Sequence, residues 1–167
     1  MSAVDQFRFD GRRAVVVGGA TGMGAATARM LADLGAEVVA LDVQDIPYEV
    51  DHSARVDLRS VASIDAALDE IGGPIDALFA CAGIATDGVP LMQVNFIGHR
   101  HLIETAIARG LMPAGSAIAA IASIGGLGWT ATRSRSATSS RPPISTPRPS
   151  GSSPVRSSRT TRSRSRR

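Results

Sequence analysis

The amino-acid sequence predicts a doubly wound α/β fold with a parallel sheet, on three grounds. Short apolar runs bounded by glycine and polar residues alternate with longer segments in which apolar residues recur every three to four positions. The apolar runs are continuous, as in strands that are buried on both faces of a sheet. Right-handed crossovers between successive parallel strands then wind the chain to both sides of the sheet.

The first half of the predicted sheet contains three strands. Arg13–Gly19 is a β-branched run that ends in glycine, Ala36–Asp42 is a second apolar run, and Ala54–Leu58 is a short third one. A helix is expected between the first two strands, over Met23–Gly35, with Gly35 as its stop signal. The residues at helical spacing that predict its buried face are Ala26, Met30 and Leu34.

The second half adds two strands and two helices. Ser60–Gly73 is predicted as an amphipathic helix that ends at a glycine pair, and Ile75–Gly83 as the fourth strand. Pro90–Gly110 is predicted as a long helix that begins with proline, and Ser116–Ser123 as a buried fifth strand. The doubly wound order 3-2-1-4-5 leaves strand five at an edge. The predicted apolar face of the Ser60 helix is Val61, Ile64, Leu68 and Ile71. Four methionines are expected to be packing residues: Met23, Met30, Met92 and Met112.

Charge divides the 167 residues into two parts. Residues 1–128 carry 8 Arg and 15 acidic residues, a net charge of −7, whereas residues 129–167 carry 10 Arg and no acid. In the second part 33 of 39 residues are Arg, Ser, Thr or Pro, and no apolar period remains to form a core. We expect a domain over 1–128, incomplete after strand five, and a disordered tail over 129–167.

Several classes of protein are disfavoured. Cys81 is the only cysteine, which excludes an intrachain disulfide and favours a reducing, cytoplasmic location. The N-terminal residues lack the apolar core of a signal peptide. The longest uncharged run, 110–132, contains several glycines and no sustained Leu/Ile/Phe stretch, so a buried strand is preferred to a membrane span. The histidines show no ligand spacing with Cys81 or with clustered acids, and no metal site is predicted.

A glycine-rich turn lies between the first strand and the first helix. Gly18, Gly22 and Gly24 permit a tight turn and a close approach to a pyrophosphate, and the helix N-terminus offers free N–H groups. Asp42, at the end of the second strand, can accept hydrogen bonds from both ribose hydroxyls of NAD and would repel the 2′-phosphate of NADP. The sequence therefore predicts a Rossmann-type site for NAD. The alternative interpretation is a glycine-rich turn beside a solvated Asp42.

The Gly-x-x-x-Gly-x-Gly spacing, with later motifs in the expected order, resembles the short-chain dehydrogenase/reductase family over about residues 9–129. The segment FDGRRAVVVGGATGMG resembles the family's opening, with Val17 where Thr is usual. Asp57-Leu58 matches the pair that contacts adenine. Ala80-Cys81-Ala82-Gly83 matches the family's Asn-Asn-Ala-Gly segment with both Asn replaced, and CAG here is similar to the bacterial 3α-hydroxysteroid and coniferyl-alcohol dehydrogenase branch.

The resemblance implies two sets of site residues. Asn95 in VNFIGHRHLIE matches the catalytic Asn, which holds a water for proton relay, and Ser123 in IASIGGLGW matches the catalytic Ser, which polarises the carbonyl. Alternatively, Asn95 is an ordinary helix residue and Ser123 only ends a strand. Cys81 is interpreted as a packing residue rather than a nucleophile. The cofactor-binding set implied by the family is Gly18, Thr21, Gly22, Met23, Gly24, Asp42, Asp57, Leu58, Cys81, Ala82 and Gly83.

The other half of the family's catalytic site is absent from the sequence. In the family a Tyr phenol exchanges the proton, and a Lys four residues later lowers its pKa, because a free phenol titrates near about pH 10. The chain has no Lys, and its one tyrosine, Tyr48, follows the second strand on the adenine side. We therefore expect the sequence as written to be inactive.

Three explanations of the tail stay open. The first is an Arg/Ser-rich arm that binds nucleic acid or acidic partners, and the second is a disordered segment without function. The third is that the gene is read out of frame from Trp129 onward. A back-translation of Thr130–Ser152 with permitted codons, read two bases later, gives GNAEPIRDFLATPDFDAAAEWI. That peptide resembles the insert before the Tyr in the same branch, so we favour the frame shift.

The resemblance implies an NAD-dependent oxidoreductase that acts on a CH–OH group of a secondary or aryl-allylic alcohol, or on the matching ketone. The alternative is a non-catalytic nucleotide-binding module with a basic interaction arm. A small-molecule substrate is expected, a membrane partner is not, and nucleic acid is considered for the tail only. Intact relatives are expected to be homo-oligomers.

Overall fold

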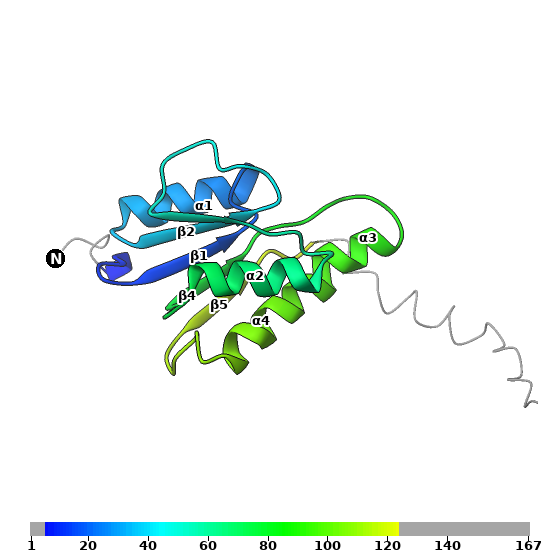
Figure 1. The fold of residues 1–167 in the computed structure, drawn as a ribbon. Helices are drawn as coiled ribbons and strands as arrows, with labels where there is room; N and C mark the ends of the chain where they lie inside the picture. Colours follow the sequence, from blue (N-terminus) through cyan, green and yellow to red (C-terminus); the bar gives the residue numbers. More distant parts are fainter. Residues whose placement is uncertain (1–5, 124–167) are drawn as a thin grey trace, which may run out of the picture. The chain divides into compact units, whose positions relative to one another are not determined.

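Five parallel strands form the centre of residues 6–123, the part of the chain that this computed structural model describes (Figure 1). They lie in the order β3-β2-β1-β4-β5, which confirms the predicted doubly wound arrangement. The strands are β1 (Arg13–Val17), β2 (Glu37–Asp42), β3 (His52–Arg55), β4 (Ala77–Ala80) and β5 (Ala117–Ala120).

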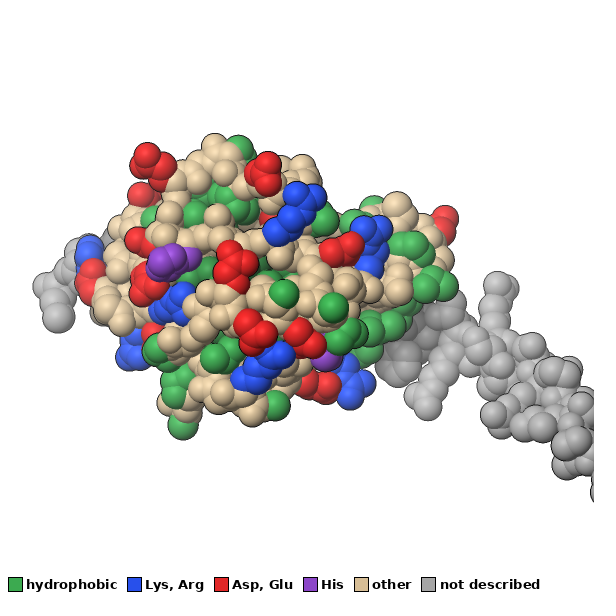
Figure 2. Space-filling model, in the orientation of Figure 1, with side chains coloured by type: hydrophobic (Ala, Val, Ile, Leu, Met, Phe, Trp, Pro, Cys, Tyr) green, Lys and Arg blue, Asp and Glu red, His purple; other side chains and the backbone are tan. Residues whose placement is uncertain are grey.

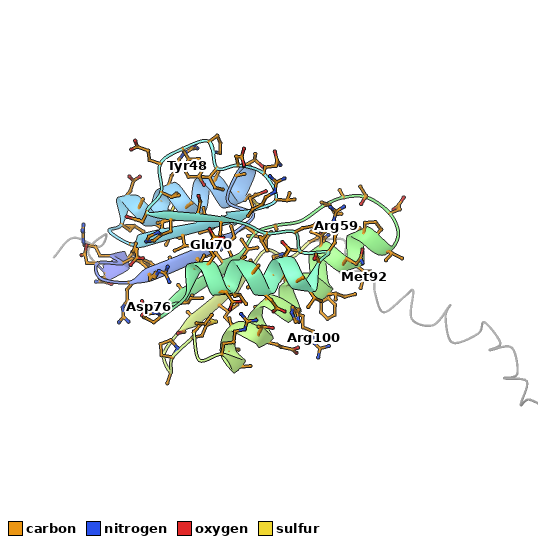
Figure 3. The ribbon with its side chains drawn as sticks, in the orientation of Figure 1. Tyr48, Arg59, Glu70, Asp76, Met92 and Arg100 are labelled. Atoms are coloured by element: carbon orange, nitrogen blue, oxygen red, sulfur yellow. The ribbon has the colours of Figure 1, made fainter. Side chains whose placement is uncertain are left out.

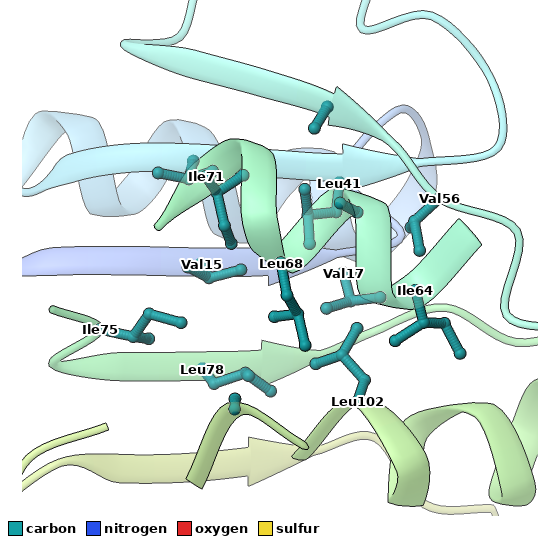
Figure 4. Close-up of a cluster of buried hydrophobic side chains, with 14 of the residues drawn as sticks. Val15, Val17, Leu41, Val56, Ile64, Leu68, Ile71, Ile75, Leu78 and Leu102 are labelled. Atoms are coloured by element: carbon teal, nitrogen blue, oxygen red, sulfur yellow. The ribbon is translucent and has the colours of Figure 1, made fainter. Parts of the chain in front are cut away.

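Alternation along β1 supplies both hydrophobic cores of the described region. Val15 and Val17 face helices α2 (Val61–Ile71) and α4 (His99–Ala108), and together these elements bury the larger core (Figure 4). Ala14 and Val16 point the other way, toward α1 (Gly22–Asp33). All four side chains are fully buried, and a buried valine contributes roughly 1.5–3 kcal/mol. The sheet is therefore covered on both faces along β1, as its continuous apolar sequence predicted.

The buried face of α1 differs from the predicted one. Ala26 and Met30 are exposed, Met30 by 63%, and Leu34 is only partly buried. The helix begins at Gly22 and packs against β1 and β2 through its small residues, because it starts directly at the glycine-rich turn and lies close to the sheet. Its buried residues are Gly24, Ala25, Ala28 and Leu31.

The methionine prediction was wrong for three of four residues. Met23, Met30 and Met92 are exposed, and only Met112 packs against the larger core. Met23 and Met30 lie on the solvent side of α1 because the small residues of that helix occupy its sheet side.

Helix α2 matches the sequence closely, whereas β3 does not. The Ser60 hydroxyl accepts a hydrogen bond from the Ser63 N–H at 3.3 Å and caps the helix. Ile64, Leu68 and Ile71 are buried as predicted, but Val61 in the first turn is 58% exposed. Strand β3 is His52–Arg55 instead of 54–58, because its pairing with β2 stops where β2 ends at Asp42. The apolar residues that suggested a later strand, Val56 and Leu58, are buried in the core beyond the end of β3, and the Val56 N–H still donates to the Asp42 carbonyl at 2.8 Å.

The predicted long helix is a continuous helical segment with a change of winding. It begins as α3 (Val89–Met92), one residue before Pro90, continues as the π-helical η2 (Gln93–Gly98), and ends as α4. The sequence did not indicate the π-helical stretch. Such stretches are rare and occur frequently at functional sites.

Strand β5 lies at the sheet edge, as predicted, but its side chains are not buried. All four residues of Ala117–Ala120 are exposed, and Ile118 is 45% exposed. Further hydrophobic side chains are exposed on the helices, and Figure 2 shows such side chains on the surface over α3. Those on α3, η2 and α4 are Val89, Met92, Phe96, Ile97 and Ile107. None of the helices within residues 6–123 is both long enough and apolar enough to cross a bilayer.

We expect the chain to self-associate through the free edge of β5. The N–H groups of Ala117 and Ile121 donate to the β4 side at 2.9 and 3.0 Å, so those of Ile118 and Ala120 point to the edge. Among residues 6–123 no further strand pairs with that edge. An uncharged edge strand is a template for another chain.

Ile118→Lys is expected to reduce this association, because a charge on an edge strand opposes pairing. Light scattering on freshly purified full-length chain measures the effect. Ile107→Lys, on the exposed side of α4, is the control for an apolar side chain elsewhere on the surface. A monodisperse monomer before any substitution would contradict the prediction.

Candidate functional site

The backbone of the glycine-rich turn lies so close to the residue after Cys81 that a side chain on Gly18 would not fit between them. Gly18 has φ +87°, and a Cβ at this position would lie 2.5 Å from the Ala82 backbone nitrogen. A Cβ on Gly24 would overlap the carbonyl oxygen of Gly18. The turn, the first turn of α1 and the loop after β4 therefore converge at the carboxyl edge of the sheet because glycine occupies both positions.

The N-terminus of α1 is left open at this edge. Thr21 is the N-cap, but its side chain makes no capping hydrogen bond, and no acidic residue lies in the first turn. The first N–H groups of a helix lack partners within the helix and carry the positive end of its dipole. This arrangement suits an anionic group such as a pyrophosphate.

Asp42, at the end of β2, is held by the backbone on both sides. Its Oδ2 accepts from the Ala20 N–H at 2.9 Å, and its Oδ1 accepts from the Gln44 N–H at 3.0 Å. Each carboxylate oxygen keeps a further lone pair, so the group can still accept hydrogen bonds from a ligand. The carboxylate is thereby fixed in direction at the sheet edge.

A second carboxylate, Asp57, is paired with Arg59. The Arg59 Nη2 lies 2.7 Å from Asp57 Oδ2, and its Nε lies 2.9 Å from Oδ1. The hydrogen bonds from the Arg59 side chain, followed by that from its backbone, lower the pKa of Asp57. Figure 3 places Arg59 at the end of the fold opposite Asp76, that is, at the carboxyl edge of the strands.

A cavity of about 470 Å³ opens at this edge, beside the carboxyl ends of β1, β2 and β4. The sequence-predicted cofactor residues, from Gly18 to Gly83, all line it. Its charged lining residues are Asp42, Asp57 and Arg59. The prediction missed seven lining residues: Val17, Val43, Gln44, Val56, Arg59, Ile84 and Val94. Five of them directly adjoin a predicted residue and Gln44 lies two residues after Asp42, which was a usable signal, whereas Val94 comes from the helical segment and is placed by the tertiary structure.

Asn95 does not line the cavity but holds a residue that does. Its Oδ1 accepts from the Ile84 N–H, and its Nδ2 donates to the Ile84 carbonyl, both at 2.9 Å. Both ends of the side-chain amide thus bind the backbone of one residue. One turn later on the same helical segment, His99 approaches the carbonyl oxygen of Ala82 at 2.9 Å.

Comparison with known proteins identifies the family. A sequence model of the short chain dehydrogenases matches residues 12–138. The chain belongs to the short-chain dehydrogenase family. This is a family of oxidoreductases, and both relatives suggested by the CAG motif are among the proteins it matches.

The curated relatives are about twice as long as the segment that aligns with this chain. Coniferyl-alcohol dehydrogenase of Pseudomonas sp. (strain HR199) is 33% identical over 122 residues, which cover 72% of this chain and 47% of the relative. The 3-alpha-hydroxysteroid dehydrogenase/carbonyl reductase of Comamonas testosteroni is 32% identical over 116 residues, with coverages of 65% and 44%. The chain therefore spans about half the length of these short-chain dehydrogenases.

Solved structures of the family share the fold, and they include complexes with NAD and with NADP. A short-chain dehydrogenase/reductase from Burkholderia phymatum in complex with NAD aligns with TM-score 0.59 and 27% identity, covering 72% of this chain and 52% of that one. A gluconate 5-dehydrogenase from Burkholderia cenocepacia in complex with NADP and tartrate aligns with TM-score 0.57 and 31% identity, covering 73% and 57%. Binding of NAD(P) is thus a property of the family.

Ser123 and Tyr48 do not line the cavity. Ser123 follows β5, is exposed, and is the last described residue. The Tyr48 hydroxyl donates to the carbonyl of Gly19 in the glycine-rich turn, and its ring packs under the Arg29 guanidinium, 4.4 Å from the ring centroid. Burial raises the pKa of Tyr48, which is opposite to the change that proton transfer near neutral pH requires. Trp129 and the tail lie outside the described residues.

The structure also bears on the reactivity of Cys81 and on metal binding. Burial raises the pKa of the Cys81 thiol, which keeps it in the unreactive protonated form. Within residues 6–123 no group of three or more His, Cys, Asp or Glu side chains is arranged to hold a metal ion.

Gly24→Ala should destabilise the fold although it lies in a helix. Alanine would ordinarily gain about 1 kcal/mol there. Instead its Cβ would meet the Gly18 carbonyl, and we expect the free energy of unfolding to fall by about 2 kcal/mol or more. Gly22→Ala is the matched control, since a Cβ at this position would meet no atom within 4 Å. Its cost comes only from the backbone angle φ of +55°, which is unfavourable for alanine by about 1 kcal/mol. Urea unfolding compares the two, and an equal loss would refute the packing argument.

Proposed function

We propose that this chain binds NAD(H) in the cavity at the carboxyl edge of the sheet, as a member of an NAD-dependent alcohol dehydrogenase or ketone reductase branch. The observation that carries the proposal is the fixed direction of Asp42, whose carboxylate lines the cavity while two backbone N–H groups hold it. A carboxylate at the end of the second strand accepts hydrogen bonds from ribose hydroxyls and repels a 2′-phosphate.

The other lining residues divide the cavity into subsites. The glycine-rich turn and the open N-terminus of α1 would receive the pyrophosphate. Asp57 and Leu58 would contact the adenine, and Ala82 and Gly83 would lie along the dinucleotide toward the nicotinamide. The cofactor would supply hydride transfer, while these residues bind and orient it. The proposed roles of the eleven cofactor residues rest on this placement and on the family.

The charges of the lining support NAD over NADP. Arg59 is the single cation among the lining residues, and its guanidinium is occupied by the Asp57 carboxylate. A 2′-phosphate would therefore meet Asp42 without an unpaired cation to offset the repulsion.

For the substrate, we propose a small secondary or aryl-allylic alcohol, or the matching ketone. The names of the relatives support this class, since they include a coniferyl-alcohol dehydrogenase and a cis-4-hydroxycyclohexanecarboxylate dehydrogenase. Ser123 would polarise the substrate oxygen and Asn95 would take part in proton relay. We place the protein in the cytoplasm on the basis of its lone thiol, Cys81.

As written, we propose that the 167 residues bind cofactor without turning it over. The sequence contains no lysine, and the hydroxyl of its single tyrosine donates to the glycine-rich turn. A gene read out of frame from Trp129 explains both the missing Tyr-x-x-x-Lys and the Arg/Ser-rich composition of the tail. Resequencing the gene tests this, since an overlapping frame that encodes Tyr-x-x-x-Lys is expected.

A nucleotide-binding module with a basic interaction arm is the second candidate. It is favoured by the opposite charges of the two parts of the chain, −7 over residues 1–128 and +10 over 129–167. In that case resequencing returns the printed tail, and deletion of 129–167 abolishes partner binding while leaving cofactor binding unchanged.

The full chain should bind NADH more tightly than NADPH, by about tenfold or more if the repulsion at Asp42 amounts to 1.4 kcal/mol. Asp42→Ala should weaken NADH binding and bring the two affinities together, because it removes both the hydrogen bonds and the charge. Titration calorimetry measures both ligands. Asp45→Ala, an exposed acid in the same loop but outside the lining, is the control. Equal or tighter NADPH binding by the unchanged chain would overturn the preference.

No alcohol oxidation with NAD is expected from the chain as written. Loss of a positioned acid/base group lowers rates by about 100- to 10,000-fold. The assay follows NADH absorbance with cinnamyl-type and cyclohexanol-type alcohols. Turnover that depends on Ser123, shown by its loss in Ser123→Ala, would contradict the proposal.

A further inference from the structure

His99 is the single buried polar or charged side chain among the described residues. It is 8% exposed, on the first turn of α4, and lies beneath the loop that follows β4. The proposed chemistry does not use it, and it does not line the cavity. A buried imidazole in an otherwise apolar core calls for a physical reason.

The hydrogen bond of His99 requires a proton on Nε2. Nε2 lies 2.9 Å from the Ala82 carbonyl oxygen, which can only accept, so Nε2 carries the proton and donates. Nδ1 is buried and has no hydrogen-bond partner among the described residues. A buried polar atom without a hydrogen-bond partner is destabilising, whereas an apolar side chain of similar size would avoid this cost. Histidine at this position therefore lowers stability in exchange for one N–H donor directed at Ala82.

The Nε2–H group of His99 binds the loop that follows β4, where strand pairing has ended. The Cys81 N–H still donates to Val17 in β1 at 2.8 Å, but beyond it the helical segment supplies the hydrogen bonds to Ala82 and Ile84. His99 holds the carbonyl of Ala82, and Asn95 holds both backbone groups of Ile84. Two side chains, four residues apart, thus position three consecutive cavity-lining residues.

The helical segment also packs against Leu58, another residue of the cavity lining. Gly98, immediately before His99, packs so closely on Leu58 that a Cβ would overlap the Leu58 carbonyl oxygen. This contact falls at the end of the π-helical stretch η2. Leu58 and Ala82 both line the cavity, so the residues at 98 and 99 contact two of its walls at once.

Ala82 connects His99 to the glycine-rich turn, because its backbone also contacts Gly18. Its backbone nitrogen and Cα lie 2.5 and 2.6 Å from where a Cβ on Gly18 would be, so the two backbones are in direct contact. A shift of Ala82 toward or away from the sheet therefore changes the width of the cavity at Gly18. His99 reaches the proposed pyrophosphate subsite through a single intervening residue.

We propose that His99 is a positioning residue for the dinucleotide, which sets the distance between the loop 82–84 and the glycine-rich turn through its Nε2–H bond to Ala82. The inference rests on the proposed cofactor site. It assigns to His99 a role in affinity that is separate from folding.

The test compares NADH affinity and thermal stability in the full chain. His99→Leu removes the donor at similar volume and should weaken NADH binding about 5- to 10-fold, as expected for loss of one hydrogen bond. Its melting temperature should change little, because the removal of the unpaired Nδ1 offsets the loss of the hydrogen bond to the Ala82 carbonyl. His99→Gln should recover most of the affinity, since its amide nitrogen reaches about as far as Nε2. His99→Asn should not recover it, because its amide reaches only the place of Nδ1.

His101→Leu is the matched control, since His101 lies on the same helix but faces Asp65 of α2 at 3.4 Å. Its NADH affinity should equal that of the unchanged chain. Unchanged affinity in His99→Leu would overturn the proposal. Equal weakening in the Leu, Gln and Asn variants would also overturn it, because packing rather than the N–H would then be responsible. If the Leu variant does not fold, the Gln-against-Asn comparison decides alone.

Hydrogen exchange of the ligand-free chain separates this proposal from the cofactor proposal. His99→Leu should accelerate exchange in the peptide that contains residues 82–84, whereas His101→Leu should not. If no form of the chain binds NADH but this acceleration occurs, the cofactor assignment fails and loop positioning stands. If exchange at 82–84 is unchanged, the positioning role fails whatever the affinity for NADH.

Discussion

The close contact between the Ala82 backbone and the glycine-rich turn is the constraint on which the rest of the site depends. β1 and β4 are neighbours in the sheet although about sixty residues separate them, and their carboxyl ends deliver Gly18 and Ala82 to one place. From β1 the chain winds to β2 and β3 on one side and to β4 and β5 on the other. Ligands in doubly wound sheets bind where the winding reverses in this way, and the cavity opens there. With any larger residue at 18 or 24, the strand ends and α1 would be forced apart.

Burial, rather than surface charge, keeps this arrangement rigid. The valines of β1 alternate between two cores, so a shift of one residue in its pairing would exchange the side chains that meet α1 with those that meet α2 and α4. On the surface, Arg109 joins α4 to Asp65 and Asp69 of α2 at 3.0 and 2.6 Å. Exposed ion pairs of this kind contribute little, typically about 0–1 kcal/mol each. They orient the two helices on a core that already specifies the fold.

The polar groups at the site serve mainly to hold backbone in place. Asp42 binds the N–H groups of Ala20 and Gln44, and Asn95 binds both backbone groups of Ile84. Tyr48 donates to Gly19, so the single tyrosine supports the glycine-rich turn and is not presented as a proton donor. Motif matching named Asp42 and Asn95 for roles toward a ligand. The structure adds that they lie in different places, since Asp42 lines the cavity whereas Asn95 lies outside the lining and binds the backbone of Ile84.

The sequence by itself determined the strand order, the positions of the helices, the glycine-rich turn with Asp42 beyond it, and the lack of lysine. These features are carried by residue type and local spacing, which do not depend on distant contacts. Only the tertiary structure decided which side of α1 is buried, where β3 ends, that β5 is exposed, and that a π-helical stretch precedes His99. Each of these is settled by contacts between elements and not by local spacing: small residues face the sheet because α1 packs close to β1 and β2, and β3 ends where β2 stops pairing. The places of His99 and Arg59 could not be predicted from the sequence for the same reason. Folding puts His99 beside the Ala82 carbonyl and Arg59 in the cavity lining, and no local pattern indicates either neighbour.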